Sequence, residues 1–273
     1  MNRNKHKTSS LIIAIIVSAI IALPIYFVFI FGFETNNEIF HRPVYLFPPH
    51  FVVSYYMEAW NSLHVNLLNS FIITAGVLII SLIVILPSAF VLSKMSHRKS
   101  NSISFIVIIL QMLPAAAVVI PLFLIFYRIG LINSYFGDML AISTVTIPFG
   151  TILLTAFMKN IPFELIEAAV VDGANSFRIF RQIVLPISQS GIVTVSLLTF
   201  MFGWGDFIFS VSLLQNQSMV PMSVGLYYFV GHYTSSWNIL MAGSMIYDLI
   251  PLVVTIIAGK SLLSGLTVGA LKE

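Results

Sequence analysis

The stretch "EAAVVDGANSFRIFRQIVLP", residues 167–186, decides how the rest of the sequence is interpreted. It places two acids and two arginines within one short segment, although only 8% of the 273 residues are charged. Long apolar runs lie on either side, and 58% of the chain is hydrophobic. Soluble domains are about one quarter charged, so lipid must be the solvent for most of this chain. The quoted stretch is then a polar connection between membrane-spanning helices.

Six apolar stretches are long enough to cross a bilayer, which takes about 20 helical residues. They are residues 11–33, 67–92, 103–127, 138–158, 189–214 and 241–263. The sequence therefore predicts an all-α integral membrane protein in which residues 1–273 form one transmembrane domain. Prolines within these stretches are either ordinary membrane-helix prolines or bends around a pathway. These prolines are Pro24, Pro87, Pro114, Pro121, Pro148 and Pro251.

The positions of lysine and arginine predict the orientation of the chain in the membrane. If the N-terminus is cytoplasmic, eleven of the thirteen basic residues fall in cytoplasmic segments, and only Arg42 and Arg128 lie outside. An excess of Lys and Arg on the cytoplasmic side is typical of membrane proteins. Both termini are therefore expected in the cytoplasm, and so is the connection 159–188, which contains the quoted stretch.

The connection 159–188 carries local signals for helix, turn and helix. Pro162 suits the first turn of a helix, Gly173 is a natural helix stop, and Asn175 or Ser176 can cap a second helix. Apolar residues then recur at helical spacing at Phe177, Phe180 and Val184. The segment is either an amphipathic loop resting on lipid headgroups or a docking surface for a cytoplasmic partner. Small residues beside acids favour the docking surface.

The spacing of this loop resembles the signature of permease subunits in binding-protein-dependent ATP-binding-cassette (ABC) importers. The signature is E-A-A, three residues, Gly, nine residues and I-x-L-P. The matching residues are Glu167, Ala168, Ala169, Gly173, Ile183, Leu185 and Pro186. The resemblance implies a type I ABC importer permease fold, in which the first helix of the loop is a coupling helix held in a cleft of the ATPase subunit. Asp172, which precedes the glycine, is included among the candidate coupling residues.

Further motifs resemble the carbohydrate-uptake branch of these importers, in particular the maltose-type second, shorter permease. They are "FPPHFVVSYYMEAW" (47–60), "GLINSYFGDML" (130–140) and "GLTVGALKE" (265–273). The chain departs from that branch at Trp204-Gly205-Asp206, where W-N-E is usual. The resemblance implies a multi-pass protein of a bacterial-type cell membrane that forms half of a translocation pathway for a sugar or oligosaccharide.

The same resemblance implies the partners of the chain. They are a second homologous permease, a dimer of the ABC ATPase and an extracytoplasmic solute-binding protein, in addition to the lipid bilayer; no nucleic acid is expected. The segment "AGKS" (258–261) lacks the first glycine of a phosphate-binding loop, because Val254 occupies that position. We therefore expect no catalytic residue and no cofactor in this chain, with ATP and magnesium held by the partner ATPase.

A metal site is also not expected. The chain contains no cysteine, and its six histidines form no metal-binding pair.

Two acids, Asp206 and Asp248, fall within the fifth and sixth predicted spans. Because acids in lipid are costly, they usually face a cavity or a partner. They could line the solute path together with Trp204, hydrogen-bond neighbouring helices, or relay protons. The last possibility defines the alternative function, a proton-coupled secondary transporter that uses Asp206 and Asp248.

The outer segment, residues 215–240, is rich in aromatic residues and has no lysine or arginine. An interfacial aromatic belt explains part of this composition. The resemblance instead implies contact with the solute-binding protein. The candidate contact residues are Tyr227, Tyr228, Tyr233 and Trp237.

Overall fold

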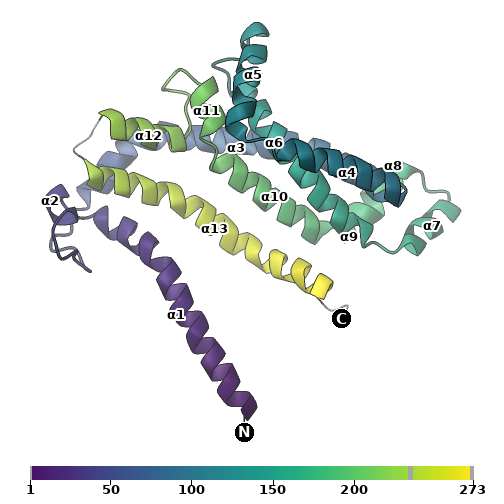
Figure 1. Cartoon of the computed structure of the whole chain (residues 1–273), viewed down its shortest axis with the longest axis horizontal. Helices are drawn as coiled ribbons and strands as arrows, with labels where there is room; N and C mark the ends of the chain where they lie inside the picture. Colours follow the sequence, from purple (N-terminus) through teal and green to yellow (C-terminus); the bar gives the residue numbers. More distant parts are fainter. Residues whose placement is uncertain (1, 233–235, 271–273) are drawn as a thin grey trace. The chain divides into compact units, whose positions relative to one another are not determined.

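The structure is a computed structural model that describes residues 2–232 and 236–270 (Figure 1). Within these residues the chain is all-helical, as the sequence predicts. In chain order the helices are α1 (Asn2–Phe31), α2 (Asn36–Ile39), α3 (Ser54–Lys94), α4 (His97–Gln111), α5 (Ala115–Arg128), α6 (Tyr135–Lys159), α7 (Phe163–Val171), α8 (Ser176–Ile179), the π-helical segment η1 (Phe180–Val184), α9 (Leu185–Ile187), α10 (Gln189–Trp204), α11 (Ile208–Leu213), α12 (Met222–His232) and α13 (Trp237–Ala270).

Four helices contain stretches that are long and apolar enough to cross a membrane. These stretches are Leu11–Phe31, Ser54–Lys94, Tyr135–Lys159 and Trp237–Gly259. Two pairs of shorter helical segments meet the same test together, although each pair is sharply bent. Arg98–Gln111 and Ala115–Arg128 meet at 90°, and Ser176–Ile187 and Gln189–Trp204 meet at 78°. The described residues therefore supply four spans, or up to six if each bent pair crosses as one.

The stretch 103–127, expected as one helix, is instead broken between α4 and α5. Pro114 stands at the break in an extended conformation (φ −64°, ψ 136°) and precedes the first residue of α5. Proline has no N–H to donate, so a helix ends more easily before it. The carbonyl of Pro114 accepts hydrogen bonds from the N–H groups of Ala117 (2.8 Å) and Val118 (3.3 Å), which starts the next helix in a new direction.

The stretch 189–214 is interrupted as well. Helix α10 ends at Trp204, and α11 begins at Ile208 after a three-residue break. By contrast, Pro24, Pro87, Pro121, Pro148 and Pro251 all lie inside continuous helices. A proline in this chain is therefore compatible with an unbroken helix, and the break at Pro114 depends on its surroundings as well.

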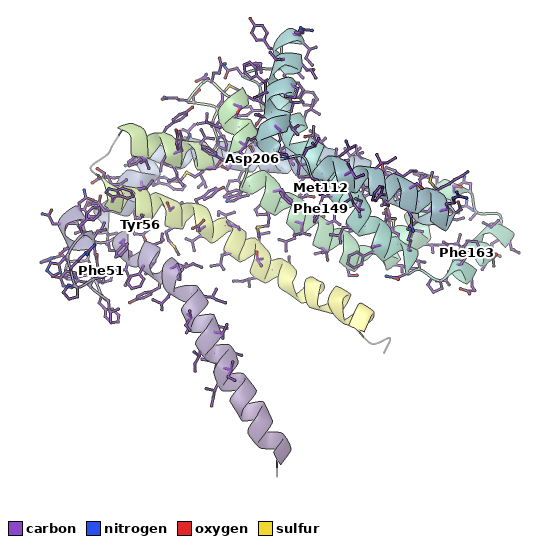
Figure 2. The ribbon with its side chains drawn as sticks, viewed as in Figure 1. Phe51, Tyr56, Met112, Phe149, Phe163 and Asp206 are labelled. Carbon is purple, nitrogen blue, oxygen red and sulfur yellow. The ribbon has the colours of Figure 1, made fainter. Side chains whose placement is uncertain are left out.

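The chain divides into two compact units. The first comprises residues 1–64 and 226–249, and the second comprises residues 65–225 and 250–273. In the first unit, the ring of Phe33 packs against Tyr56 (4.6 Å between centroids) and Phe51 (5.0 Å) (Figure 2). The Tyr56 hydroxyl donates to the carbonyl of Phe29 at 3.0 Å. These contacts tie the end of α1 to the start of α3.

The second unit is built around α6, against which α4, α10 and α11 pack. A hydroxyl contact of 2.7 Å between Ser81 and Thr146 joins α3 to α6. Gly150 of α6 lets the helices approach closely, because a Cβ at that position would lie 2.5 Å from Ile85 on α3 and 3.0 Å from Val195 on α10. Close packing around α6 positions the two features described next, the connection 159–188 and a cavity.

Candidate functional site

The first helix of the connection 159–188 ends in a complete hydrogen-bonded glycine cap. Gly173 has φ +76°, a conformation that L side chains rarely adopt. The N–H of Ala174 donates to the carbonyl of Ala169 (2.9 Å), and the N–H of Gly173 donates to the carbonyl of Val170 (3.0 Å). This pair of bonds is the Schellman motif. It confirms the predicted helix stop at Gly173.

The second helix of the connection begins with a side-chain cap. The Asn175 carboxamide oxygen accepts the N–H of Arg178 at 2.8 Å, so Asn175, not Ser176, is the capping residue. The chain then forms the π-helical segment η1 before it reaches α9. The order of helix, glycine turn and helix is as predicted.

The buried face of the second helix includes the predicted Val184 and part of Phe180 but not Phe177. Phe177 was expected on the apolar face, but it is 67% exposed, whereas Ile179 and Val184 are buried. The expectation assumed uniform α-helical spacing, and the π-helical turn between residues 180 and 184 changes the direction in which successive side chains point. Phe180 is half-buried against Phe90, with ring centroids 5.1 Å apart.

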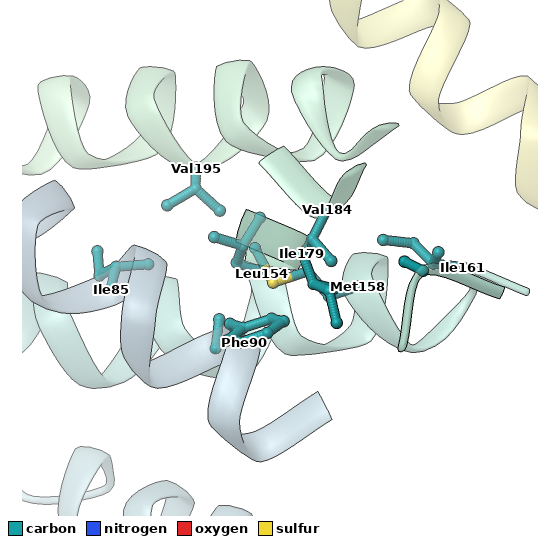
Figure 3. Packing of buried hydrophobic residues seen from close by; sticks show 10 residues of the cluster. Ile85, Phe90, Leu154, Met158, Ile161, Ile179, Val184 and Val195 are labelled. Carbon is teal, nitrogen blue, oxygen red and sulfur yellow. The ribbon is translucent and has the colours of Figure 1, made fainter. Parts of the chain in front are cut away.

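A hydrophobic cluster joins this connection to the long helices of the second unit (Figure 3). The connection contributes three buried residues to this cluster, namely Ala169 of α7, Ile179 of α8 and Val184 of η1. The other buried members come from α3, α6, α10 and the loop between α6 and α7. They are Ile85, Ala89, Phe90, Leu154, Met158, Ile161 and Val195. The predicted residues Ile183 and Leu185 pack at the edge of the cluster.

The remaining predicted residues of the connection face outward. Glu167, Ala168, Asp172, Gly173 and Pro186 are exposed. Several apolar side chains of α7 are also exposed, and Val171 reaches 86%. Figure 2 shows Phe163, the first residue of α7, at one end of the second unit. Helix α7 therefore offers a mixed apolar and acidic surface on one side, while Ala169 seats it against the cluster on the other.

A cavity of about 360 Å³ lies elsewhere in the second unit, beside the break between α10 and α11. Asp206, from this break, is among the residues that line it. The Asp206 carboxylate accepts the backbone N–H and the hydroxyl of Ser210, each at 2.9 Å. These bonds hold the first turn of α11, and they place the carboxylate within the break. The predicted path residue Asp206 is thus a structural anchor and a cavity-lining residue at once.

Asp138 is a buried acid that the sequence analysis missed. The hydroxyl of Ser210 lies 3.0 Å from the Asp138 carboxylate, so one serine bridges Asp138 of α6 and Asp206. The second oxygen of Asp138 is buried and makes no hydrogen bond within the described part of the chain. The sequence signal for Asp138 is an acid in the first turn of an otherwise apolar helix. The signal for Ser210 is its position four residues after Asp206, one helical turn along the chain.

The other candidate path residues do not join this group. Trp204 is buried, with ring centroids 5.0 Å from Phe71 and 5.6 Å from Phe200, and it is not among the residues that line the cavity. Asp248 belongs to the other unit, where it lies exposed on α13. The structure therefore assigns only Asp206 of these three residues to the cavity.

The aromatic candidates of the outer segment are partly described. Tyr227 is exposed and packs against Tyr228, with ring centroids 5.7 Å apart. Trp237 makes an edge contact with Phe40 at 6.2 Å. Tyr233 lies outside the described residues. The positions of Tyr227 and Trp237 leave apolar ring surface open to solvent, since each is more than one third exposed.

The part of the outer segment that belongs to the second unit is held by asparagine side chains. Asn69 of α3 donates to the carbonyls of Ser218 (2.9 Å) and Val220 (3.0 Å) and accepts from the Tyr135 hydroxyl (2.7 Å). Asn133 accepts the N–H groups of Gln215 (3.0 Å) and Asn216 (2.8 Å). Asn69 and the motif at residues 130–140 therefore share one structural task, which is to position residues 215–220.

Comparison with known proteins connects these features to a family. The family model described as "Binding-protein-dependent transport system inner membrane component" matches residues 85–264. That range includes the connection 159–188, the cavity and most of the described helices.

Curated relatives align over nearly the whole chain. The glucose import system permease protein GlcU of Saccharolobus solfataricus is 30% identical over 258 residues, which covers 92% of this chain and 90% of that protein. The sn-glycerol-3-phosphate transport system permease protein UgpE of Agrobacterium fabrum is 28% identical, covering 90% of this chain and 91% of that protein.

A solved structure shares the fold. It is a subunit of a bacterial ABC transporter involved in the import of the acidic polysaccharide alginate, with a TM-score of 0.75 and 22% sequence identity. The match covers 93% of this chain and 96% of that one. The family match and the full-length relatives favour an importer subunit over a proton-coupled secondary transporter. The chain therefore belongs to the binding-protein-dependent transport system inner membrane components, the transmembrane subunits of ABC importers.

Proposed function

We propose that this chain forms half of the translocation pathway of an importer for a sugar or a related polyol, and that α7 receives the motion of a separate ATPase. The solute class rests on the relatives, since one is named for glucose import and another for sn-glycerol-3-phosphate transport. The chain itself is not catalytic in this proposal, and the ATPase holds ATP and magnesium.

The observation that supports the proposal is that the two sides of α7 differ. One side of α7 is exposed and carries acids and apolar side chains, which suits a protein cleft. The other side is seated through Ala169 in a cluster shared with α3, α6 and α10. Close-packed side chains transmit displacement because protein interiors have low compressibility. A partner that moves α7 can therefore move the helices around the cavity.

The proposed mechanism is a shift between two states. An ATPase dimer that closes on ATP would hold the paired permeases in one arrangement and release them to the other after hydrolysis. A ligand shifts such an equilibrium only through its different affinities for the two states. The contact between α7 and the ATPase is the place where that difference would act on this chain.

The proposed assembly contains a second homologous permease, two ATPase subunits and an extracytoplasmic binding protein. We place both termini in the cytoplasm on the basis of the lysine and arginine distribution. Tyr227 and Trp237, with their exposed ring surface, are the proposed contacts with the binding protein, together with Tyr228 and Tyr233. Asp172 is proposed to act with Glu167 in contacting the ATPase.

Substitution of Gly173 tests the proposed coupling. In Gly173→Val, the side chain has open space around it, but the φ of +76° becomes strained and the helix stop is distorted. We expect ATP-dependent solute uptake by the assembled importer to fall at least about tenfold, with the chain still inserted in the membrane. Uptake and ATP hydrolysis would be measured in proteoliposomes that contain all subunits.

The chain offers a matched control at Gly130. This glycine has a similar φ of +72° and equally open surroundings, but it lies between α5 and α6. Gly130→Val should bring a similar backbone strain and leave uptake coupled to ATP hydrolysis. Equal losses of uptake in the two variants would reject α7 as the coupling element. Gly173→Asn should retain more activity than Gly173→Val, because asparagine tolerates positive φ better.

A further inference from the structure

The cavity beside Asp206 has a chemical character that bears on the solute. Its walls come from α5, α6, α10, α11 and the break between the last two, all within the second unit. The lining residues are Ala115, Ile142, Val145, Thr146, Met201, Phe202, Gly205, Asp206, Phe207, Ile208 and Phe209. Figure 2 shows Asp206 in the region where these elements meet. The lining is mainly apolar and aromatic, with few polar groups.

No lysine, arginine or histidine is among the lining residues. An anionic group that entered the cavity would lose water and gain no cationic side chain in exchange. Burial of a charge without a paired partner is costly. Asp206 is the sole ionisable lining residue, and a second carboxyl group, Asp138, is bridged to it by Ser210. Both groups act against an anion, either by repulsion when ionised or by offering no positive charge when protonated.

The polar groups at the cavity suit hydroxyl groups instead. The Asp206 carboxyl accepts hydrogen bonds, as its contacts with Ser210 show. Ala115 is the first residue of α5, where N–H groups have no acceptor within the helix. The Pro114 carbonyl takes up the N–H groups of Ala117 and Val118, which leaves those of Ala115 and Ala116. A solute hydroxyl can donate to Asp206 and accept from such an N–H group. Aromatic and aliphatic walls, such as Phe202 and Val145, can cover the C–H faces of a sugar ring.

We propose that this cavity binds a neutral, hydroxyl-rich solute, a sugar or an uncharged polyol, and excludes phosphorylated, sulfonated and carboxylated ones. The proposal rests on the proposed importer function and narrows its solute class. In this proposal Asp206 determines specificity, because its carboxyl group accepts hydrogen bonds from the hydroxyl groups of the solute.

The test uses the complete importer, with its own binding protein, reconstituted in proteoliposomes. Uptake is compared with and without ATP inside the vesicles. Radiolabelled neutral probes would be glucose, maltose, trehalose and glycerol. Matched anionic probes would be glucose 6-phosphate, galacturonate and glycerol 3-phosphate. We expect accumulation of one or more neutral probes and at least tenfold less of every anionic probe. Accumulation of an anionic probe to a comparable level overturns the proposal.

The variant Asp206→Asn separates the cavity from the binding protein as the source of this selectivity. Asparagine can still accept the Ser210 N–H, so the first turn of α11 is retained. We expect the KM for the accumulated neutral solute to rise about tenfold, with expression and binding-protein-stimulated ATP hydrolysis retained. Glu58→Gln, which neutralises an exposed acid on α3, is the matched control and should leave the KM unchanged. A KM for Asp206→Asn within twofold of the wild-type value overturns the role of Asp206.

The two proposals fail in different ways. Uptake that continues without ATP would reject the importer mechanism, while the charge of the accumulated solute would still decide the nature of the cavity. ATP-driven uptake of an anion would support the importer and reject the neutral-solute cavity.

Discussion

Glu34, in the turn that follows α1 and outside the membrane-spanning segments, is a fully buried acid. Neither of its carboxylate oxygens makes a hydrogen bond within the described residues. Burial raises the pKa of Glu34 above its ordinary value of 4.5, and the nearby charge of Glu38 raises it further. The folded chain therefore binds this proton more tightly than the unfolded chain does, and stability falls as the pH rises through 4.5 toward the raised pKa.

Glu34→Gln should stabilise the chain at neutral pH because glutamine does not ionise. We expect a gain in Tm of a few degrees at pH 7.5, equivalent to about 1 kcal/mol. The gain should shrink as the pH is lowered toward 4.5, where the unfolded wild-type chain is itself protonated. Thermal unfolding of the purified protein in detergent between pH 4.5 and 8 measures this difference.

Glu38 provides the control, because its pKa is shifted in the opposite direction from that of Glu34. A hydrogen bond of 2.7 Å from His50 is the main cause that lowers the pKa of Glu38. The contribution of Glu38 to folding stability is fully present above pH 4.5, and it is lost as the pH falls through the lowered pKa. Glu38→Gln should therefore lower the Tm at neutral pH. A Tm for Glu34→Gln below the wild-type value at pH 7.5 would contradict the account of Glu34.

At the scale of elements, short loops are held by side chains, and Asn133 is the clearest case. It has φ +60°, and its side-chain oxygen accepts two backbone N–H groups from residues 215 and 216. Its own N–H donates to the carbonyl of Leu213 at 2.9 Å. One residue thus connects the loop before α6 to the end of α11.

Two substitutions of Asn133 separate its hydrogen bonds from its backbone conformation. Asn133→Gly removes the two accepted hydrogen bonds and keeps a backbone that tolerates positive φ, at an expected cost of about 1–2 kcal/mol. Asn133→Ala removes the same bonds and adds roughly 1 kcal/mol of strain. We therefore expect the Tm to fall in the order wild type, glycine variant, alanine variant. An alanine variant at least as stable as the glycine variant would show that the positive φ carries no cost.

At the scale of the whole molecule, the absence of cysteine makes the orientation directly testable. Phe47→Cys and Val171→Cys introduce single thiols at sites that are 75% and 86% exposed. The lysine and arginine distribution predicts that residue 47 lies outside and residue 171 in the cytoplasm. In intact cells that lack the ATPase subunit, a membrane-impermeant maleimide should label only Phe47→Cys. Val171→Cys should be labelled after permeabilisation.

The unmodified chain is the blank for this experiment, since it has no thiol to react. Labelling of Val171→Cys in intact cells would place α7 on the outer side. That result would be incompatible with a cytoplasmic ATPase at this helix.

Features that depend on contiguous residues follow from the amino-acid sequence alone. Four of the six apolar runs form continuous helices long enough to cross a membrane. The Gly173 stop and the Asn175 cap form from bonds within a few residues. The connection 159–188 was therefore predictable down to its glycine turn, and so was its resemblance to the permease loop.

Features that join distant residues depend on how the helices pack. Ser210 and Asp138 are 72 positions apart, and no local pattern indicates that they share a hydrogen bond. The burial of Ile179 in place of Phe177, and the seating of Trp204 between aromatic rings away from the cavity, also depend on packing. Local hydrogen bonds are encoded by spacing along the chain, whereas a cavity forms where several helices leave space between them.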